Sequence, residues 1–87
     1  MQLLPGNIVR STAGRDKDHL YVVVTITPNR VMVADGVKRL VSAPKPKNCL
    51  HLQLVDKAKV ATTDDDIRRI LQSRDLLEEK KGGIYNG

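Results

Sequence analysis

Residues 20–26 alternate between two sets of largely apolar side chains, and β-branched residues dominate the segment. One set contains Leu20, Val22, Val24 and Ile26, and the other contains Tyr21, Val23 and Thr25. A period of two with many β-branched residues is typical of a β-strand that packs one face on a core. We therefore expect a half-buried strand over residues 20–26.

Pro28–Asn29 ends this apolar segment and predicts a turn, because both residue types favour turn conformations. With the two residues as the turn, Ile26 would pair with Val31 and Val24 with Val33. The apolar residues of both strands then fall on one face without a shift of register. A hairpin is the expected result.

Asp35–Gly36 is a second turn signal, since a type I′ hairpin turn needs positive φ at both central residues and Asp-Gly supplies them readily. This turn would place Val31 opposite Leu40 and Met32 opposite Arg39. The three strands are then expected to form a meander.

Two further short strands are expected outside the meander, one at Ile8–Val9 and one at Leu50, Leu52 and Leu54, with Cys49, His51 and Gln53 on the opposite face. Five short strands in some 50 residues favour a small β-barrel. We assign residues 1–57 to the barrel and residues 58–87 to a linker, a helix and a glycine-rich tail.

The C-terminal third changes to a helical period. Thr63 followed by Asp66 resembles a capping box, and acidic residues 64–66 suit the positive end of the helix dipole. An apolar stripe follows at Ile67, Ile70, Leu71 and Leu77. Lys80–Lys81 and Gly82–Gly83 suit the end of a helix, so the helix is predicted over about residues 63–81.

The 87 residues carry a net charge of +5, and its distribution is uneven. Residues 1–57 contain nine basic and four acidic residues, a net charge of +5, whereas the remainder is balanced. A basic excess confined to one part of a small chain points to a polyanionic partner, most often nucleic acid. Plain solubility is the alternative explanation.

Enzyme signatures such as a phosphate-cradling glycine loop or a nucleophile elbow do not occur. His19 and His51 have no nucleophile nearby in sequence, so we expect no catalytic role. The run Asp64–Asp66 could suggest a metal site, but helix capping is favoured because consecutive side chains diverge. We expect no cofactor and no metal.

The chain has no apolar run long enough for a membrane span and no signal-peptide pattern, and Cys49 is its single cysteine. These features predict a cytoplasmic protein without a disulfide. The only Tyr, Trp or Phe residues are Tyr21 and Tyr85, too few for base stacking, a proline-rich-peptide groove or a methyl-lysine cage. Contact with the phosphates, sugars and shape of a structured RNA is the remaining mode.

Two segments are candidate contact sites. The charged loop at residues 14–18 contains Arg15 and Lys17 beside one glycine, and loops on a rigid scaffold often bind ligands. The segment 43–48 contains Lys45 and Lys47, each directly after a proline, and the two prolines favour a stiff, extended arm. The alternatives are surface ion pairs with Asp16 or Asp18 for the first segment and a solvated loop for the second.

Residues 5–9 and Gly14–Lys17, followed by the strand Tyr21–Val24, resemble the KOW motif of ribosomal proteins and of the NusG and Spt transcription factors. The resemblance extends to residues 31–36, to Lys38–Arg39, and to residues 45–48 leading into His51–Leu52. They are similar to the archaeal and eukaryotic large-subunit ribosomal protein fourteen group and its short bacterial relatives. Members often have glycine after the loop lysine, where this chain has Asp18–His19.

The resemblance implies a mainly β protein with a five-stranded SH3-like barrel, followed by one helix, that binds ribosomal or other structured RNA. The implied and inferred RNA-binding residues are Gly14, Arg15, Lys17, Lys38, Arg39, Lys45, Lys47, Asn48 and His51. The alternative function is a protein-interaction module that docks a ribosomal protein or a transcription or translation factor through the barrel or helix. The protein could be a stoichiometric ribosomal component or a transient factor.

Overall fold

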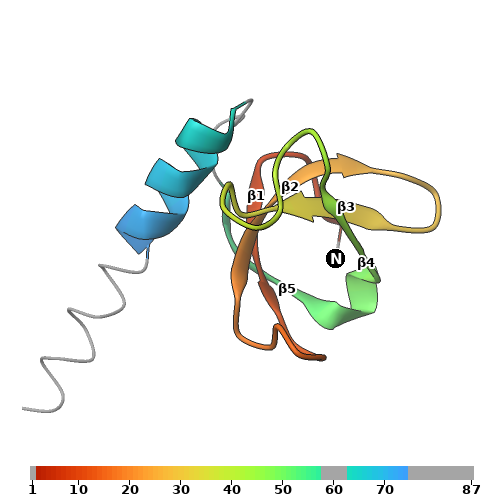
Figure 1. Cartoon of the computed structure of the whole chain (residues 1–87). Helices are drawn as coiled ribbons and strands as arrows, with labels where there is room; N and C mark the ends of the chain where they lie inside the picture. The colour runs from red at the N-terminus through yellow and green to blue at the C-terminus, as the bar shows by residue number, and fades with distance from the viewer. Residues whose placement is uncertain (1, 58–62, 75–87) are drawn as a thin grey trace, which may run out of the picture.

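Within residues 2–57, five antiparallel strands form one sheet with the order β4-β3-β2-β1-β5. The computed structural model describes residues 2–57 and 63–74. The strands are β1 (Asn7–Ser11), β2 (Leu20–Ile26), β3 (Val31–Ala34), β4 (Lys45–Lys47) and β5 (Leu52–Lys57), with a 3-10 turn, η1 (Cys49–His51), before β5. A helix follows over residues 64–74, and it lies against one side of the sheet (Figure 1).

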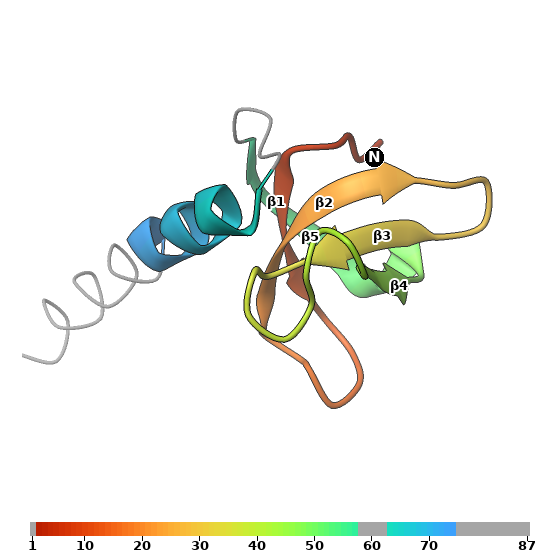
Figure 2. The same cartoon turned by 45° about the horizontal axis from the view of Figure 1, so that its top comes forward.

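The sheet curls strongly, so that β4 and β5 come round toward each other and η1 joins them, as the second view also shows (Figure 2). Both remain edge strands, and the barrel is therefore open. The predicted class, a mainly β SH3-like fold followed by one helix, is confirmed.

The predicted half-buried strand at residues 20–26 is wrong in one respect, because β2 buries both faces along its first four residues. Tyr21 and Val23 belong to a core inside the curled sheet that also contains Leu3, Val9, Val31, Val33 and Leu52. Leu20 and Val22 belong to a second core on the outer face, together with Ile8, Ala34, Ile67 and Leu71. Ile67 and Leu71 belong to the helix, which covers the outer face of β2. This face of the strand is therefore apolar, because it packs on the helix and does not meet solvent.

The turn at Pro28–Asn29 is confirmed, since Ile26 pairs with Val31 as predicted. The predicted pairing of Val24 with Val33 is wrong, because Val33 pairs with Val23 and the register shifts before Thr25. Val24 is thus the extra residue of a β-bulge. A bulge bends its strand and increases its twist, which suits a sheet that curls into a barrel.

The predicted hairpin at Asp35–Gly36 is wrong. Gly36 has a φ of 79°, but Asp35 lacks the positive φ that a type I′ turn requires. The Asp35 side chain instead accepts hydrogen bonds from the amides of Val37 (2.8 Å) and Arg39 (3.0 Å), which stabilises a longer loop. Residues 35–44 form this β3–β4 loop, and β3 pairs with residues 45–47 in place of the predicted partners Leu40 and Arg39.

The last predicted strand begins later than expected. Leu52 and Leu54 lie in β5, whereas Cys49, Leu50 and His51 form η1. Asn48 caps this turn, because its side-chain oxygen accepts a hydrogen bond from the Leu50 amide at 2.9 Å. The alternation predicted across residues 49–54 therefore fails at its first three positions.

The helix begins as the capping pattern predicts. The Thr63 hydroxyl accepts a hydrogen bond from the Asp66 amide at 3.2 Å, and the buried Ile67 and Leu71 pack on the sheet. The helix therefore packs on its own barrel. The predicted positions Leu77, Lys80–Lys81 and Gly82–Gly83 lie outside the described residues.

Candidate nucleic-acid interface

Asp16, in the middle of the charged loop between β1 and β2, turns its carboxylate inward. Its two oxygens lie 2.6 Å from the Tyr21 hydroxyl, 2.9 Å from the Ser11 hydroxyl, 3.0 Å from Lys45 Nζ and 3.1 Å from Lys47 Nζ. The Tyr21 and Ser11 groups and the two ammonium groups come from β2, β1 and β4. One acidic side chain therefore ties the loop to three strands.

The network has clear electrostatic consequences. Burial alone would raise the pKa of Asp16, but the hydrogen bonds from Tyr21, Lys45, Ser11 and Lys47 outweigh burial and hold this pKa far below its usual range. Burial and the bond to Asp16 raise the pKa of Tyr21. Asp16 is thus a carboxylate whose charge is compensated inside the protein.

Lys45 and Lys47 do not lie on a protruding arm. Their segment is the edge strand β4, in which Pro46 is tolerated because an edge strand can lack one amide donor. Only 9% of the Lys47 side chain is exposed, and its ammonium group also lies 3.1 Å from Ser11 Oγ. Asp16 forms its ion pairs with Lys45 and Lys47 of β4, and not the surface pairs with Arg15 or Lys17 that were the alternative to ligand binding.

The rest of the loop turns outward. Gly14 has a φ of 88° and Asp18 a φ of 74°, and the Asp18 amide donates a hydrogen bond to the Ser11 carbonyl at 2.7 Å. Arg15 and Lys17 flank Asp16 in sequence and are exposed. The inward carboxylate and the short internal bonds therefore hold a compact loop with two cations on its surface.

The β3–β4 loop contains a second inward carboxylate. Asp35 accepts its two amide hydrogen bonds and lies 2.9 Å from Nε2 of His19. Burial would raise the pKa of Asp35, yet the bonds from the Arg39 and Val37 amides and from His19 lower it. Lys38 and Arg39 are exposed on the same loop.

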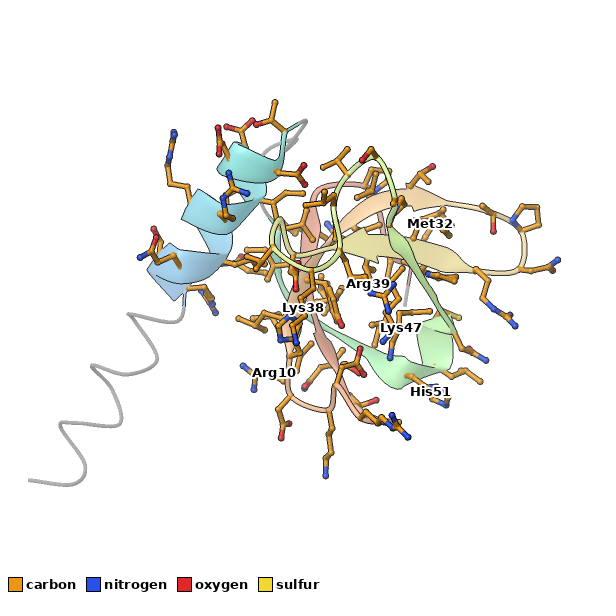
Figure 3. The ribbon with its side chains drawn as sticks, viewed as in Figure 1. Arg10, Met32, Lys38, Arg39, Lys47 and His51 are labelled. Carbon is orange, nitrogen blue, oxygen red and sulfur yellow. The ribbon has the colours of Figure 1, made fainter. Side chains whose placement is uncertain are left out.

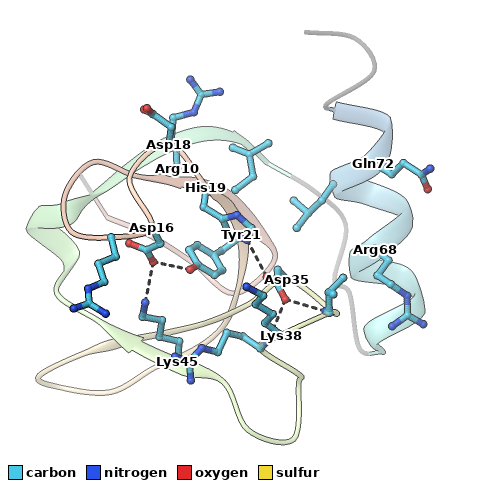
Figure 4. Close-up of a pocket in the computed structure, with 15 residues that line it drawn as sticks. Arg10, Asp16, Asp18, His19, Tyr21, Asp35, Lys38, Lys45, Arg68 and Gln72 are labelled. Atoms are coloured by element: carbon cyan, nitrogen blue, oxygen red, sulfur yellow. Dashed lines mark hydrogen bonds and ion pairs between the residues drawn. The ribbon is translucent and has the colours of Figure 1, made fainter. Parts of the chain in front are cut away.

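These two loops, β1, β4 and the helix surround an open depression of ≈ 970 Å³. Figure 4 shows the helix, with Arg68 and Gln72, on one side of the view and Asp16 and Lys45 on the other. Six basic residues line the depression against three acidic ones, Asp16, Asp18 and Asp35, an excess of three positive charges. Because Asp16 pairs with Lys45 and Asp35 is bonded within its own loop, the exposed cations of the lining are Arg15, Lys38, Arg39 and Arg68, and Arg68 also pairs with Asp65.

Four of the predicted site residues line this depression, namely Arg15, Lys38, Arg39 and Lys45. The sequence interpretation missed Arg10 and Arg68, which also line it. Arg68 follows the buried Ile67 and so lies at the margin of the apolar stripe. That position could be assigned to the site only once the helix was known to pack on the sheet.

The other predicted residues do not line the depression: Gly14, Lys17, Lys47, Asn48 and His51. Figure 3 shows His51 on η1, whereas Arg10 and Lys38 lie toward the helix. Asn48 caps η1 and Lys47 binds Asp16, so both have structural contacts. The structure therefore divides the predicted composite surface into a central group and an outlying group.

A separate groove of ≈ 610 Å³ lies near the N-terminus and η1. Its lining includes no charged residue, and it contains the exposed apolar side chains of Leu4, Ile26 and Leu50. Leu50 is 82% exposed. The described part of the chain thus has a charged concavity and, separate from it, an apolar one.

Comparison with known proteins adds no family: no protein-family model matches the chain, and no curated protein matches it significantly. The fold and the depression define a small SH3-like protein with a positively charged concave surface. Within residues 2–57 and 63–74, no helix has the length and hydropathy of a membrane crossing. The same residues contain no cluster of three or more His, Cys, Asp or Glu side chains that could hold a metal ion.

Proposed function

We propose that this chain is a non-enzymatic, KOW-type RNA-binding protein that contacts ribosomal or other structured RNA in the cytoplasm. The observation that carries the proposal is the arrangement of charge around the depression. Arg15, Lys38 and Arg39 are exposed around it, while the Asp16 carboxylate pairs with Lys45 and Lys47 and the Asp35 carboxylate accepts hydrogen bonds within its own loop. A phosphate backbone is the ligand class that such a concave cationic surface attracts.

The surface favours contact with phosphates over base stacking. Tyr21 is the one Phe, Tyr or Trp residue in the described part of the chain, it is 3% exposed, and its hydroxyl is bound to Asp16. A ring held in this way cannot serve as a stacking platform for an unpaired base. We therefore assign recognition to the backbone and shape of a folded RNA.

The resemblance to the KOW motif supports the same assignment. In that motif a glycine shapes the RNA-contacting loop, and here Gly14 has the left-handed backbone that glycine adopts most easily. Arg15 lines the depression and Lys17 is exposed beside it. The outlying Asn48 and His51 would contact RNA only if it extends past β4.

The salt dependence of RNA affinity tests the proposal. If Arg15, Lys38, Arg39 and Arg68 meet four phosphates, log affinity should fall with log salt at a slope of about −3 to −3.5. Replacing Arg15, Lys38 and Arg39 by Glu should abolish binding at moderate salt. Arg30→Glu is the control for charge reversal elsewhere on the surface, and it is compared with each single reversal as well as with the triple variant, since Arg30 is exposed at the β2–β3 turn, outside the depression.

A flat salt response, or equal effects of the triple variant and of Arg30→Glu, would remove the RNA assignment for this surface. If RNA binding is observed, sucrose-gradient sedimentation distinguishes a stoichiometric ribosomal component from a transient factor. Stoichiometric co-migration with the large subunit after a high-salt wash indicates a structural component, and loss indicates a transient factor.

The second candidate function is a protein-interaction module, and the uncharged groove beside Leu4, Ile26 and Leu50 is the observation that favours it. An apolar segment of a ribosomal protein or of a transcription or translation factor would fit such a groove. Docking of a partner on the helix is less favoured, because the apolar side chains of Ile67 and Leu71 already pack on the sheet. Leu50→Asp should abolish partner binding and leave salt-dependent RNA binding intact.

A further inference from the structure

The β3–β4 loop that carries Lys38 and Arg39 touches the helix at three points. The amide of Val41 donates a hydrogen bond to Asp64 Oδ1 at 2.8 Å, and Arg68 Nη1 donates one to the Gly36 carbonyl at 2.5 Å. The donors and acceptors lie 23 and 32 residues apart in sequence. The loop is thus bound to the first turns of the helix on both sides of Lys38–Arg39.

The third contact is steric. A Cβ atom at Gly36 would lie 2.7 Å from the backbone oxygen of Asp64 and 2.9 Å from Cγ of Arg68. Separations this short require the helix or the loop to move, and the Gly36 φ of 79° disfavours a side chain as well. The helix therefore packs directly on the loop backbone at Gly36, immediately before Val37–Arg39.

We infer that the C-terminal helix positions Lys38 and Arg39 for phosphate contact by clamping the β3–β4 loop through Asp64, Arg68 and the close approach at Gly36. Asp64 and Gly36 are positioning residues, because they act on the RNA through the loop. Arg68 both clamps the loop and lines the depression. The binding consequence rests on the proposed function, whereas the clamp itself can be tested without RNA.

Asp64→Ala tests the clamp by amide hydrogen exchange in the full-length protein. Loss of one hydrogen bond alone would expose only the Val41 amide. Loss of a clamp should also accelerate exchange, by about tenfold or more, at the amides of Val37, Arg39 and Ala43, which are bonded within the loop. Asp64→Asn keeps the side-chain oxygen and should restore near-wild-type exchange.

Gly36→Ala provides a second test with a matched control at Gly14. Both glycines have left-handed backbone, with φ of 79° and 88°, but a Cβ at Gly14 meets only Asp16 Oδ1 at 3.6 Å. Gly36→Ala should accelerate exchange in both the β3–β4 loop and the helix amides after residue 67. Gly14→Ala should leave both segments unchanged.

RNA binding supplies the last readout. Asp64→Ala should weaken RNA affinity about tenfold or more and reduce the salt slope by about 1 to 2, because Lys38 and Arg39 lose their fixed positions. Unchanged exchange at Val37, Arg39 and Ala43 would overturn the clamp. Faster exchange with unaltered affinity and slope would overturn the positioning role, while an absence of RNA binding by the wild-type protein would overturn the proposed function alone.

Discussion

The two loops that carry exposed cations are held in place by different interactions. The β1–β2 loop is held from inside the barrel, where Asp16 gathers two ammonium groups and two hydroxyls. The β3–β4 loop is held at its own Asp35 and from outside, where the helix binds its backbone at Gly36 and Val41. The first loop therefore depends strongly on charge, and the second depends on the docking of a separate element.

This difference makes the two halves of the candidate interface separable by mutation. A change in the helix should affect Lys38 and Arg39 and spare Arg15. A change at Asp16 should do the reverse.

Ile67→Ala should have the largest effect, since Ile67 is fully buried between the helix and the sheet. Truncating a buried Ile costs about 3 kcal/mol of unfolding free energy. Urea denaturation measures the loss, and hydrogen exchange should locate it in the helix and β3–β4 loop. Ile70 is only partly buried against the same core, so Ile70→Ala should cost clearly less, and an equal loss there would contradict the assigned packing.

Asp16→Asn should destabilise the protein by about 2 kcal/mol, because it removes the negative charge opposite the buried Lys47. Asp18→Asn is the matched control in the same loop, since Asn tolerates left-handed backbone and Asp18 is exposed. Its expected change is within about 0.5 kcal/mol. Equal effects of the two substitutions in urea denaturation would refute the role of the Asp16 network.

Acid pH should destabilise the protein through both inward carboxylates. The folded state lowers the pKa of Asp16 and of Asp35, so the unfolded chain binds more protons below about pH 4 to 5. The stability that the two groups contribute is present above their unfolded pKa and is lost as pH falls toward their folded values. Urea midpoints between pH 7 and 3 measure this loss, and Asp16→Asn should make the curve shallower.

Lys17→Ala should have the smallest effect. Lys17 is exposed, and stability should change by no more than about 0.5 kcal/mol. Lys17 lies outside the depression, so the salt slope of RNA binding should change by at most about 1. A larger change would move the centre of the interface from the depression to the tip of the β1–β2 loop.

Local pattern was enough to predict β2, the turn at Pro28–Asn29 and the Thr63 cap. Those features depend on residues a few positions apart. The Asp35–Gly36 pair wrongly predicted a tight hairpin. The Asp35 side chain accepts hydrogen bonds from the amides of Val37 and Arg39, and these bonds stabilise a longer loop instead. Strand pairing at β4 then followed from contacts that no local pattern contains.

The sequence was enough to predict that the candidate site is basic, but it predicted only some of the residues that line the depression. The excess of basic residues and the exposure of Arg15, Lys38 and Arg39 were within reach of the sequence. The inward direction of Asp16 was not, because its lysine partners lie 29 and 31 residues away. Arg68 entered the site only through the docking of the helix.

The composition of β4 also bears on how the protein behaves at high concentration. An open sheet exposes unpaired backbone groups at its edges, and such edges promote association between copies. Here the edge at β4 is three residues long, and its middle residue, Pro46, has no amide hydrogen. At this edge of the sheet, the strand that supplies the two internal ammonium groups is therefore also a poor template for the growth of a sheet between molecules.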